Sequence, residues 1–214
     1  MLTKLRIEVC KLNIELKQNN LVTMTSGNVS ARDFQTNFVV IKPSGIPYEQ
    51  LTYDKLVVVD LNGRVIEGKY KPSVDTATHL YIYRKRKDIG GIVHTHSPYA
   101  TSFAILGKPI PVYCTAMADE FGGSIPVGEF APIGGEEIGK EIIKSIGRSC
   151  AILMKQHGVF TIGKTPDDAF KRAVMLEDIS KTIHLALLKG RPKPLPKKIV
   201  EKLYERYQKK YGQK

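Results

Sequence analysis

Three features of the sequence predict a single α/β domain in which a sheet is flanked by helices. The chain has 214 residues with 42% hydrophobic content, which is enough for one sizeable core, and no stretch in it is typical of an interdomain linker. Short runs of Val, Ile and Phe alternate with segments of helical character. No uninterrupted run of about 18 apolar residues indicates a membrane helix, and no export signal is recognisable at the start. We therefore expect one domain over residues 1–214, located in the cytoplasm and without membrane contact.

The first part of the chain is expected to form a helix followed by short strands. Residues 1–18 carry apolar positions among Lys and Glu, compatible with an opening helix although the periodicity is imperfect. From residue 21 to about 68 come runs such as NFVVIK and KLVVVDLNGRVIEG, broken by Gly, Pro and Asn. Within the second run, LNGR is typical of a hairpin turn. Residues 75–88 then favour a helix.

The middle of the chain predicts a strand between helical segments. Ile92 and Val93 are β-branched and follow a Gly-Gly pair that marks a turn, so the stretch GGIVHTHS is expected to be a strand. Pro98 can begin a short helix that ends near Leu106. Another helix is expected at about residues 136–146.

The last third predicts strands and then two helices. Residues 150–163 read CAILMKQHGVFTIG, which favours a strand or a strand pair. The next segment carries Thr165 as N-cap, Pro166 at the first helical position, two acids in the first turn and Gly190 as its stop. Residues 197–214 are expected to form a charged terminal helix with a loose end.

Charge and cysteine content exclude several classes of protein. The formal net charge is +12, and residues 190–214 alone carry nine Lys or Arg and two Asp or Glu, a net of +7. Because no nucleic-acid motif accompanies this basic tail, we expect a solvated helix face or attraction to an anionic metabolite, and no nucleic-acid partner. Cys10, Cys114 and Cys150 are odd in number and lack C-x-x-C spacing, so we expect buried thiols and neither a disulfide framework nor a thiolate zinc site.

Histidines at strand ends are candidate metal ligands. His94 and His96 would share one face of a strand, because residues two apart project to the same side. His157, in MKQHGVF, ends a second apolar run beside Gly158, which would let the backbone turn tightly. Three histidines with one open position match a catalytic zinc site, but ordinary hydrogen-bonded histidines explain the residues equally well. His79 and His184 are weaker candidates, favoured as packing residues or as partners behind the ligands.

Polar turns suggest an anion site. TMTSGNVSAR contains a Gly that can expose backbone N–H groups and an Asn that can donate from its amide. IKPSGIPY and KPSVDTATH each contain a Lys-Pro-Ser turn. For each turn alone, turn chemistry is the favoured explanation, since Pro fixes φ and Ser bonds its own backbone. The candidate residues in these stretches are Gly27, Asn28, Lys42, Ser44, Gly45, Ser73 and Asp75.

In this order, the stretches TSGNVS, IKPSG, KPSVDTATH, GGIVHTHS and KQHGVF resemble the class II sugar-phosphate aldolase and epimerase family, from about residue 21 to the end. The resemblance implies a mostly antiparallel central sheet, a homotetramer with fourfold symmetry, active sites at subunit interfaces and a small sugar phosphate as substrate. It implies Zn²⁺, or another divalent metal, on His94, His96 and His157. It also implies that the substrate and its phosphate are held by Gly27, Asn28, Lys42, Ser44, Gly45 and Ser73.

Both activities of this family begin by cleaving the carbon–carbon bond next to a ketose carbonyl, which leaves an enediolate that a metal can stabilise. An aldolase then protonates the enediolate carbon, a role that the resemblance gives to a Glu beside the metal, and this chain has Asp75 at the matching position. An epimerase lets the aldehyde rotate and re-adds it from the other face. It needs proton-transfer groups on both sides of the reacting hydroxyl.

Four residues favour the epimerase. Asp75 matches its P-S-S-D pattern, Lys42 stands where the aldolase usually has Thr, Asp119 in AMADEFGG matches an acid/base Asp, and Tyr211 lies in a terminal Y-G-Q. The resemblance therefore implies that Asp75, Asp119 and Tyr211 are catalytic and that the tail, residues 190–214, contributes to the active site.

The sequence thus predicts zinc-dependent epimerisation of L-ribulose 5-phosphate to D-xylulose 5-phosphate. The alternative is an L-fuculose-1-phosphate-type aldolase that releases dihydroxyacetone phosphate and lactaldehyde. Val74 and Met117 depart from the family pattern, which leaves room for a different pentulose or hexulose phosphate. A non-enzymatic module of the adducin type would not be expected to keep three histidines, Asp119 and a terminal tyrosine together.

Overall fold

The computed structural model describes residues 1–212; Gln213 and Lys214, the end of the terminal motif, lie outside the described residues. The strands are β1 (Asn28–Arg32), β2 (Val39–Ile41), β3 (Val57–Val59), β4 (Val65–Glu67), β5 (Gly91–Thr95), β6 (Val127–Gly128), β7 (Ala151–Met154) and β8 (Gly158–Gly163). The α-helices are α1 (Thr3–Gln18), α2 (Thr76–Lys85), α3 (Pro98–Ile105), α4 (Thr115–Phe121), α5 (Glu137–Ser145), α6 (Pro166–Lys189) and α7 (Lys197–Lys210). Two short 3₁₀ helices, η1 (Tyr48–Gln50) and η2 (Tyr53–Lys55), lie between β2 and β3.

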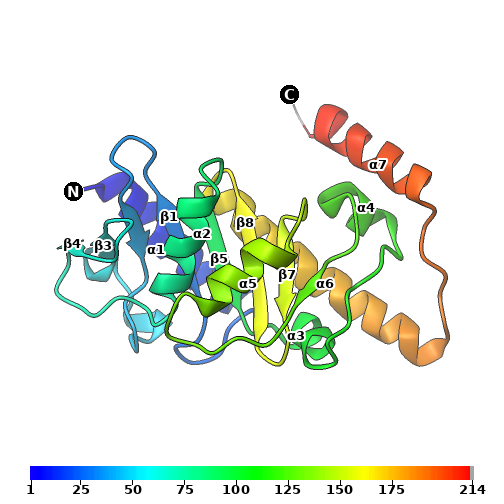
Figure 1. Ribbon diagram of the computed structural model, residues 1–214, viewed down its shortest axis with the longest axis horizontal. Coiled ribbons are helices and arrows are strands. Elements are labelled where there is room, and N and C mark those ends of the chain that lie inside the picture. The colour runs from blue at the N-terminus through cyan, green and yellow to red at the C-terminus, as the bar shows by residue number, and fades with distance from the viewer. Residues whose placement is uncertain (213–214) are drawn as a thin grey trace.

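The strands form one sheet in the order β4-β3-β2-β1-β5-β8-β7-β6. Neighbouring strands pair antiparallel except β6 and β7, which pair parallel. Helices cover both faces, as Figure 1 shows, with α2 and α5 in front of the sheet and α6 behind it. The predicted α/β domain with a mostly antiparallel sheet is confirmed.

Alternation along the strands divides the core between the two faces. Ile92 and Phe160 belong to the core on the side of α2 and α5. Val93 and Val159, their neighbours in sequence, face the opposite side, where α1, α3 and α6 pack. The period of two in these runs therefore buries apolar side chains on both sides, which explains why the strands read as continuous apolar runs.

Strand β5 lies in the middle of the sheet and ends at the candidate metal motif. Its residue His94 pairs in register with Asn28 of β1 on one side and with Phe160 of β8 on the other. The histidine motif and the end of the Ser-Gly-Asn loop are therefore direct neighbours. This register fixes the position of the site relative to the sheet.

One helix and the burial of two cysteines differ from the expectations. Helix α4 was not predicted, although Met117, Ala118 and Phe121 are buried in it and α7 packs against it. Only Cys10 is fully buried, whereas Cys114 and Cys150 are half-buried, so the expectation of buried thiols was wrong for two of the three free cysteines.

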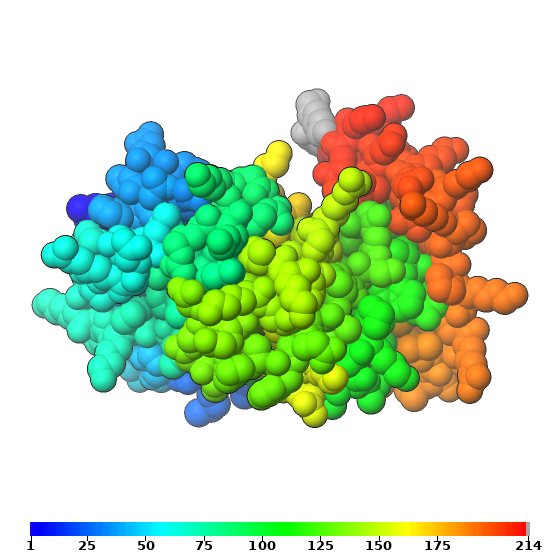
Figure 2. Space-filling view, viewed as in Figure 1, coloured from blue at the N-terminus to red at the C-terminus, as the bar shows by residue number. Residues whose placement is uncertain are grey.

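The C-terminal helix occupies one end of the molecule. In the space-filling view α7, in red, rests on the green surface around α4, at the opposite end from the blue N-terminal segment (Figure 2). Among residues 1–212, no helix combines the length and the apolar character needed to cross a membrane.

Candidate metal centre and anion pocket

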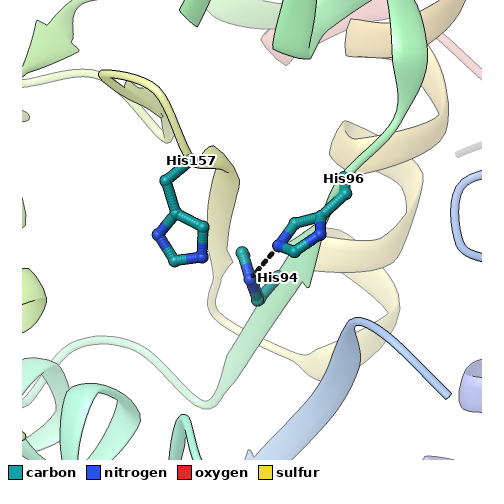
Figure 3. A group of neighbouring side chains, drawn as sticks. All are labelled: His94, His96 and His157. Carbon is teal, nitrogen blue, oxygen red and sulfur yellow. Dashed lines mark hydrogen bonds between the residues drawn. The ribbon is translucent and has the colours of Figure 1, made fainter. Parts of the chain in front are cut away.

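Three histidines from two strand ends meet at one point. His94 is the fourth residue of β5, His96 follows the end of that strand, and His157 lies in the turn between β7 and β8. One ring nitrogen from each lies within 4.8 Å of the others. Nε2 of His96 is 3.0 Å from Nε2 of His94. Figure 3 shows the three rings turned toward a common point.

The surroundings of His94 fix the orientation of its ring. Its Nδ1 lies 3.0 Å from the carbonyl oxygen of Val159, to which it can donate, and this leaves Nε2 for the cluster. The ring stacks on Phe160 with centroids 4.2 Å apart and planes 14° apart. A ligand whose second nitrogen is held by a backbone carbonyl is the arrangement that metal-binding histidines commonly show.

The three rings suit a divalent metal ion. Burial lowers the pKa of His94 to about 3 and also lowers the pKa values of His96 and His157, so all three rings are neutral at pH 7. A metal needs the neutral form, because the coordinating nitrogen must carry a free lone pair. Nδ1 of His157 is buried and has no hydrogen-bond partner among the described residues. Together these properties mean that the cluster could bind a metal such as Zn²⁺.

Gly158 has a different role from the expected one. The left-handed backbone of the β7–β8 turn is at Gln156, with φ 55°, and not at Gly158. A Cβ on Gly158 would lie 2.6 Å from the carbonyl oxygen of Thr95 and 2.7 Å from Cδ2 of His96. The glycine is therefore needed because strand β8 passes very close to the Thr95 backbone and the His96 ring. The tight turn lies directly before Gly158, at residues 155–157, and the expectation that this glycine makes it possible was wrong.

Gly27 joins the Ser-Gly-Asn loop to the histidine strand. Its φ is +73°, and a Cβ there would lie 2.5 Å from Cγ1 of Val22 and 2.8 Å from the carbonyl oxygen of His94. Any side chain would push the loop away from β5 and also strain its backbone. A glycine is therefore required at this position, where the loop packs directly against His94 of β5.

The two Lys-Pro-Ser turns lie side by side. Pro43 and Pro72 form an isolated antiparallel bridge. The backbone N–H of Ser44 donates to the carbonyl of Lys71 at 2.9 Å, and that of Ser73 donates to the carbonyl of Lys42 at 3.0 Å. Because the N–H groups of Ser44 and Ser73 are used in the pairing, each serine can offer an anion only its hydroxyl.

One pocket of about 310 Å³ contains the histidine cluster and the polar turns. Ten residues singled out from the sequence line it: Gly27, Asn28, Lys42, Ser44, Gly45, Ser73, Asp75, His94, His96 and His157. Val74 and Ile133 also line it and are 60% and 68% exposed. Ile133 was not predicted to belong to the site, because nothing in the sequence distinguishes it from other single apolar residues in loops.

Asp75 lies deep in this pocket. Its Oδ2 accepts a hydrogen bond of 2.7 Å from the Asn28 amide and one of 3.4 Å from the Ser73 hydroxyl. Burial raises the pKa of the carboxyl, but the neighbouring imidazoles of His94 and His79 and the amide outweigh it, so the pKa lies below its ordinary value. Asp75 is therefore a carboxylate at neutral pH.

Lys42 supplies positive charge from beneath the pocket. Its Nζ donates to the carbonyl of Thr25 at 3.0 Å and lies 4.8 Å from the centre of the Tyr48 ring. Burial lowers the pKa of Lys42 to about 8, against the attraction of Asp75. The ammonium form therefore still predominates at pH 7 and favours an anion in the pocket.

Asp119 and Tyr211 are outside the pocket of a single chain. Asp119 lies on α4, where its carboxylate is 3.4 Å from the guanidinium of Arg206 on α7. Tyr211 is 65% exposed at the end of α7 and its ring stacks on Tyr207 with centroids 4.4 Å apart. One chain therefore does not bring these two predicted catalytic residues to the histidines, and their roles stay predictions.

His79 and His184 are not part of the cluster. His184 lies against Tyr99, with ring centroids 5.5 Å apart. His79 is fully buried in α2, with Nδ1 2.7 Å from the hydroxyl of Ser30 and Nε2 without a partner among the described residues. It is a packing residue behind the pocket.

The buried His79 is expected to make the stability of the metal-free protein depend on pH. Burial lowers its pKa to about 4 in the folded protein, against about 6.5 in an unfolded chain. Between these two values the unfolded chain binds a proton that the folded protein does not. The free energy of unfolding should thus fall as the pH falls, by about 1.4 kcal/mol per pH unit from this residue.

Denaturant unfolding of wild type and His79→Gln at several pH values between 4.5 and 7.5, with chelator present, measures this effect. The variant should show a shallower pH slope by about one proton. Parallel slopes for the two proteins would contradict the assignment of a neutral, buried His79.

The chain is similar to known proteins over almost its whole length. The family model "Class II Aldolase and Adducin N-terminal domain" matches residues 7–184. A solved structure of an L-fuculose 1-phosphate aldolase is 31% identical, with a TM-score of 0.91, covering 96% of each chain. L-fuculose 1-phosphate aldolases from Glaciozyma antarctica and Thermus thermophilus are 23% and 24% identical, with TM-scores of 0.80 and 0.73. They cover 95% and 90% of this chain and 81% and 99% of their own, and at these identities show the shared fold alone.

Proposed function

Because this chain belongs to the class II aldolase and adducin family, we propose that it is a metal-dependent enzyme that cleaves a carbon–carbon bond of a phosphorylated ketose. The observation that carries the proposal is that a three-histidine cluster and a wall of anion-binding groups share one pocket. A metal site alone or an anion site alone would fit many reactions. Their combination fits a substrate with an anionic end and a carbonyl end.

Different residues of the pocket would bind the anionic end and the carbonyl end of the substrate. His94, His96 and His157 would hold the metal, with Zn²⁺ as the proposed ion. A divalent metal there supplies a Lewis acid for the negative charge that bond cleavage leaves on the ketose oxygens. The polar wall beside the histidines would bind the phosphate and so orient the ketose. Its groups are the ammonium of Lys42, the amide of Asn28, the hydroxyls of Ser44 and Ser73, and the backbone at Gly27 and Gly45.

Asp75 supports epimerisation as the outcome of cleavage. An aldolase needs a carboxyl group that reaches the enediolate carbon, whereas Oδ2 of Asp75 accepts a hydrogen bond of 2.7 Å from the Asn28 amide. Asp75 is also one methylene shorter than the Glu that the resemblance gives to aldolases. An epimerase omits protonation of that carbon, so the proposed reaction is conversion of L-ribulose 5-phosphate to D-xylulose 5-phosphate.

Cleavage and re-addition to opposite faces of one aldehyde require two proton-transfer groups. We assign these roles to Asp119 and Tyr211, supplied to the pocket by a neighbouring subunit of a homotetramer, with the tail from residue 190 contributing to the site. Neither residue lines the pocket of its own chain, which supports such sharing.

The second candidate is an L-fuculose-1-phosphate-type aldolase. The similarity of nearly the whole chain to an aldolase of that specificity favours it. In that reaction dihydroxyacetone phosphate leaves and the aldehyde product is lactaldehyde.

Incubation of the metal-loaded protein with L-ribulose 5-phosphate and, separately, with L-fuculose 1-phosphate tests the proposal. Formation of D-xylulose 5-phosphate from the first, without net release of dihydroxyacetone phosphate from the second, is the expected result. Faster release of dihydroxyacetone phosphate would favour the aldolase, and no turnover of either sugar phosphate would contradict both assignments.

A further inference from the structure

Three consecutive carbonyl groups of the Ser-Gly-Asn loop are held by side chains from another segment. The carbonyl oxygen of Thr25 accepts a hydrogen bond of 3.0 Å from Nζ of Lys42. The hydroxyl of Tyr48 lies 2.7 Å from the carbonyl oxygen of Ser26 and 2.9 Å from that of Gly27, so its single hydrogen is shared between them. The loop that borders the pocket is therefore anchored through its carbonyls.

Tyr48 is built as a permanent hydrogen-bond donor. Its side chain is 1% exposed, at the start of η1, and is packed in the core formed by α1, β1 and their neighbours. Burial, with a smaller effect of Asp75, raises its pKa well above the ordinary value near 10. The phenol hence stays protonated at neutral pH and can donate its hydrogen.

The direction of these carbonyls matters for an anion. A peptide group presents its oxygen on one side and its N–H on the other, so a carbonyl aimed into the pocket would repel a phosphate and remove a donor. The conformation of Gly27 allows the N–H groups to face an anion. Its left-handed φ of +73° is one in which adjacent peptide groups can be turned toward an anion. The hydroxyl of Tyr48 holds the carbonyls of Ser26 and Gly27 in the direction that they have.

We propose that Tyr48 is a positioning residue of the anion site: it holds the carbonyls of Ser26 and Gly27 away from the bound phosphate and keeps the loop's donors facing it. The inference rests on the proposed function for the identity of the anion. It adds a residue that does not itself line the pocket and that acts through the loop. The Tyr48 ring also supports Lys42, whose ammonium holds the preceding carbonyl.

Tyr48→Phe tests the role of the hydroxyl, since it removes one oxygen and keeps the ring and its packing. The dissociation constant for inorganic phosphate and the KM for the phosphorylated ketose should both rise about tenfold, the factor for one hydrogen bond of about 1.4 kcal/mol. Metal content should be unchanged. For an unphosphorylated ketose kcat/KM should also be unchanged, which a general loss of structure would not allow.

Tyr83→Phe is the matched control. Tyr83 is also fully buried, and its hydroxyl lies 2.9 Å from the Ser30 hydroxyl and donates at 3.1 Å to the Ser30 carbonyl, away from the pocket. This variant should bind phosphate as wild type does, and thermal unfolding of both metal-loaded variants verifies that they are folded at the assay temperature.

An unchanged phosphate affinity in Tyr48→Phe, or equal losses of affinity in both variants, would overturn the proposal. Equal losses of kcat/KM with phosphorylated and unphosphorylated ketoses would do the same. Phosphate binding by calorimetry needs no turnover, so failure of this inference is distinguishable from failure of the proposed reaction.

Discussion

The His157→Ala protein is expected to remain folded, to lose its metal and to show no measurable turnover. His157 lies in the β7–β8 turn and is only partly buried, so truncation there leaves the sheet core intact. His94 and His96 would then be the remaining ligands, and two imidazoles do not complete a zinc site. Metal analysis by mass spectrometry, circular dichroism and an activity assay measure the three parts of this result.

His184→Ala is the control for loss of a histidine. Its ring lies on α6 against Tyr99, outside the pocket, so metal content and activity should match the wild type. If the His157→Ala protein kept one equivalent of metal, His157 would not be a ligand. If it lost the metal and kept full turnover, the reaction would not depend on this site.

Local chemistry made most of the secondary structure predictable. The predicted capping residue of the long helix is confirmed, since Thr165 accepts from the backbone of Asp168 in a reciprocal capping box. The β-branched Ile92 and Val93 after a Gly-Gly pair correctly predicted a strand. The residues that form each of these signals lie within a few positions of one another, so the signal can be recognised in the sequence without knowledge of the fold. The seven residues of α4 gave no comparable signal, because the helix depends on burial of Met117 and on contact with α7.

The candidate site was predictable as a set of residue types, but its geometry depends on long-range pairing. The two Lys-Pro-Ser turns were each ambiguous, and only their mutual pairing at Pro43 and Pro72 places them on one wall. The close approach that requires Gly158 joins two strands and is invisible locally. Tyr48 was missed for the same reason, since a buried tyrosine is common and its partners lie more than twenty residues earlier.

Asp119→Asn is expected to lower epimerisation by about 10²-fold while metal content stays at the wild-type level, the usual scale for loss of one acid/base group. Asp119 does not line the pocket of its own chain, and the described contact of its carboxylate is with Arg206. Substitution by Asn keeps the shape of the side chain and removes its ability to exchange a proton. The metal-binding half and the proton-transfer half of a site are then expected to come from different chains.

Mixing two inactive variants tests whether the metal-binding half and the proton-transfer half of one site come from different chains. His157→Ala keeps Asp119, and Asp119→Asn keeps the histidines, so a site that takes its histidines from the second variant and its aspartate from the first is intact. Refolding or co-expressing equal amounts should restore about a quarter of the wild-type activity, because each site draws its two halves independently from two chains of a closed ring. If both halves came from one chain, every site in the mixture would carry one defect, and activity would not rise above that of the Asp119→Asn protein. That outcome would remove Asp119 from the proposed shared site, since the single chain holds it apart from the three histidines.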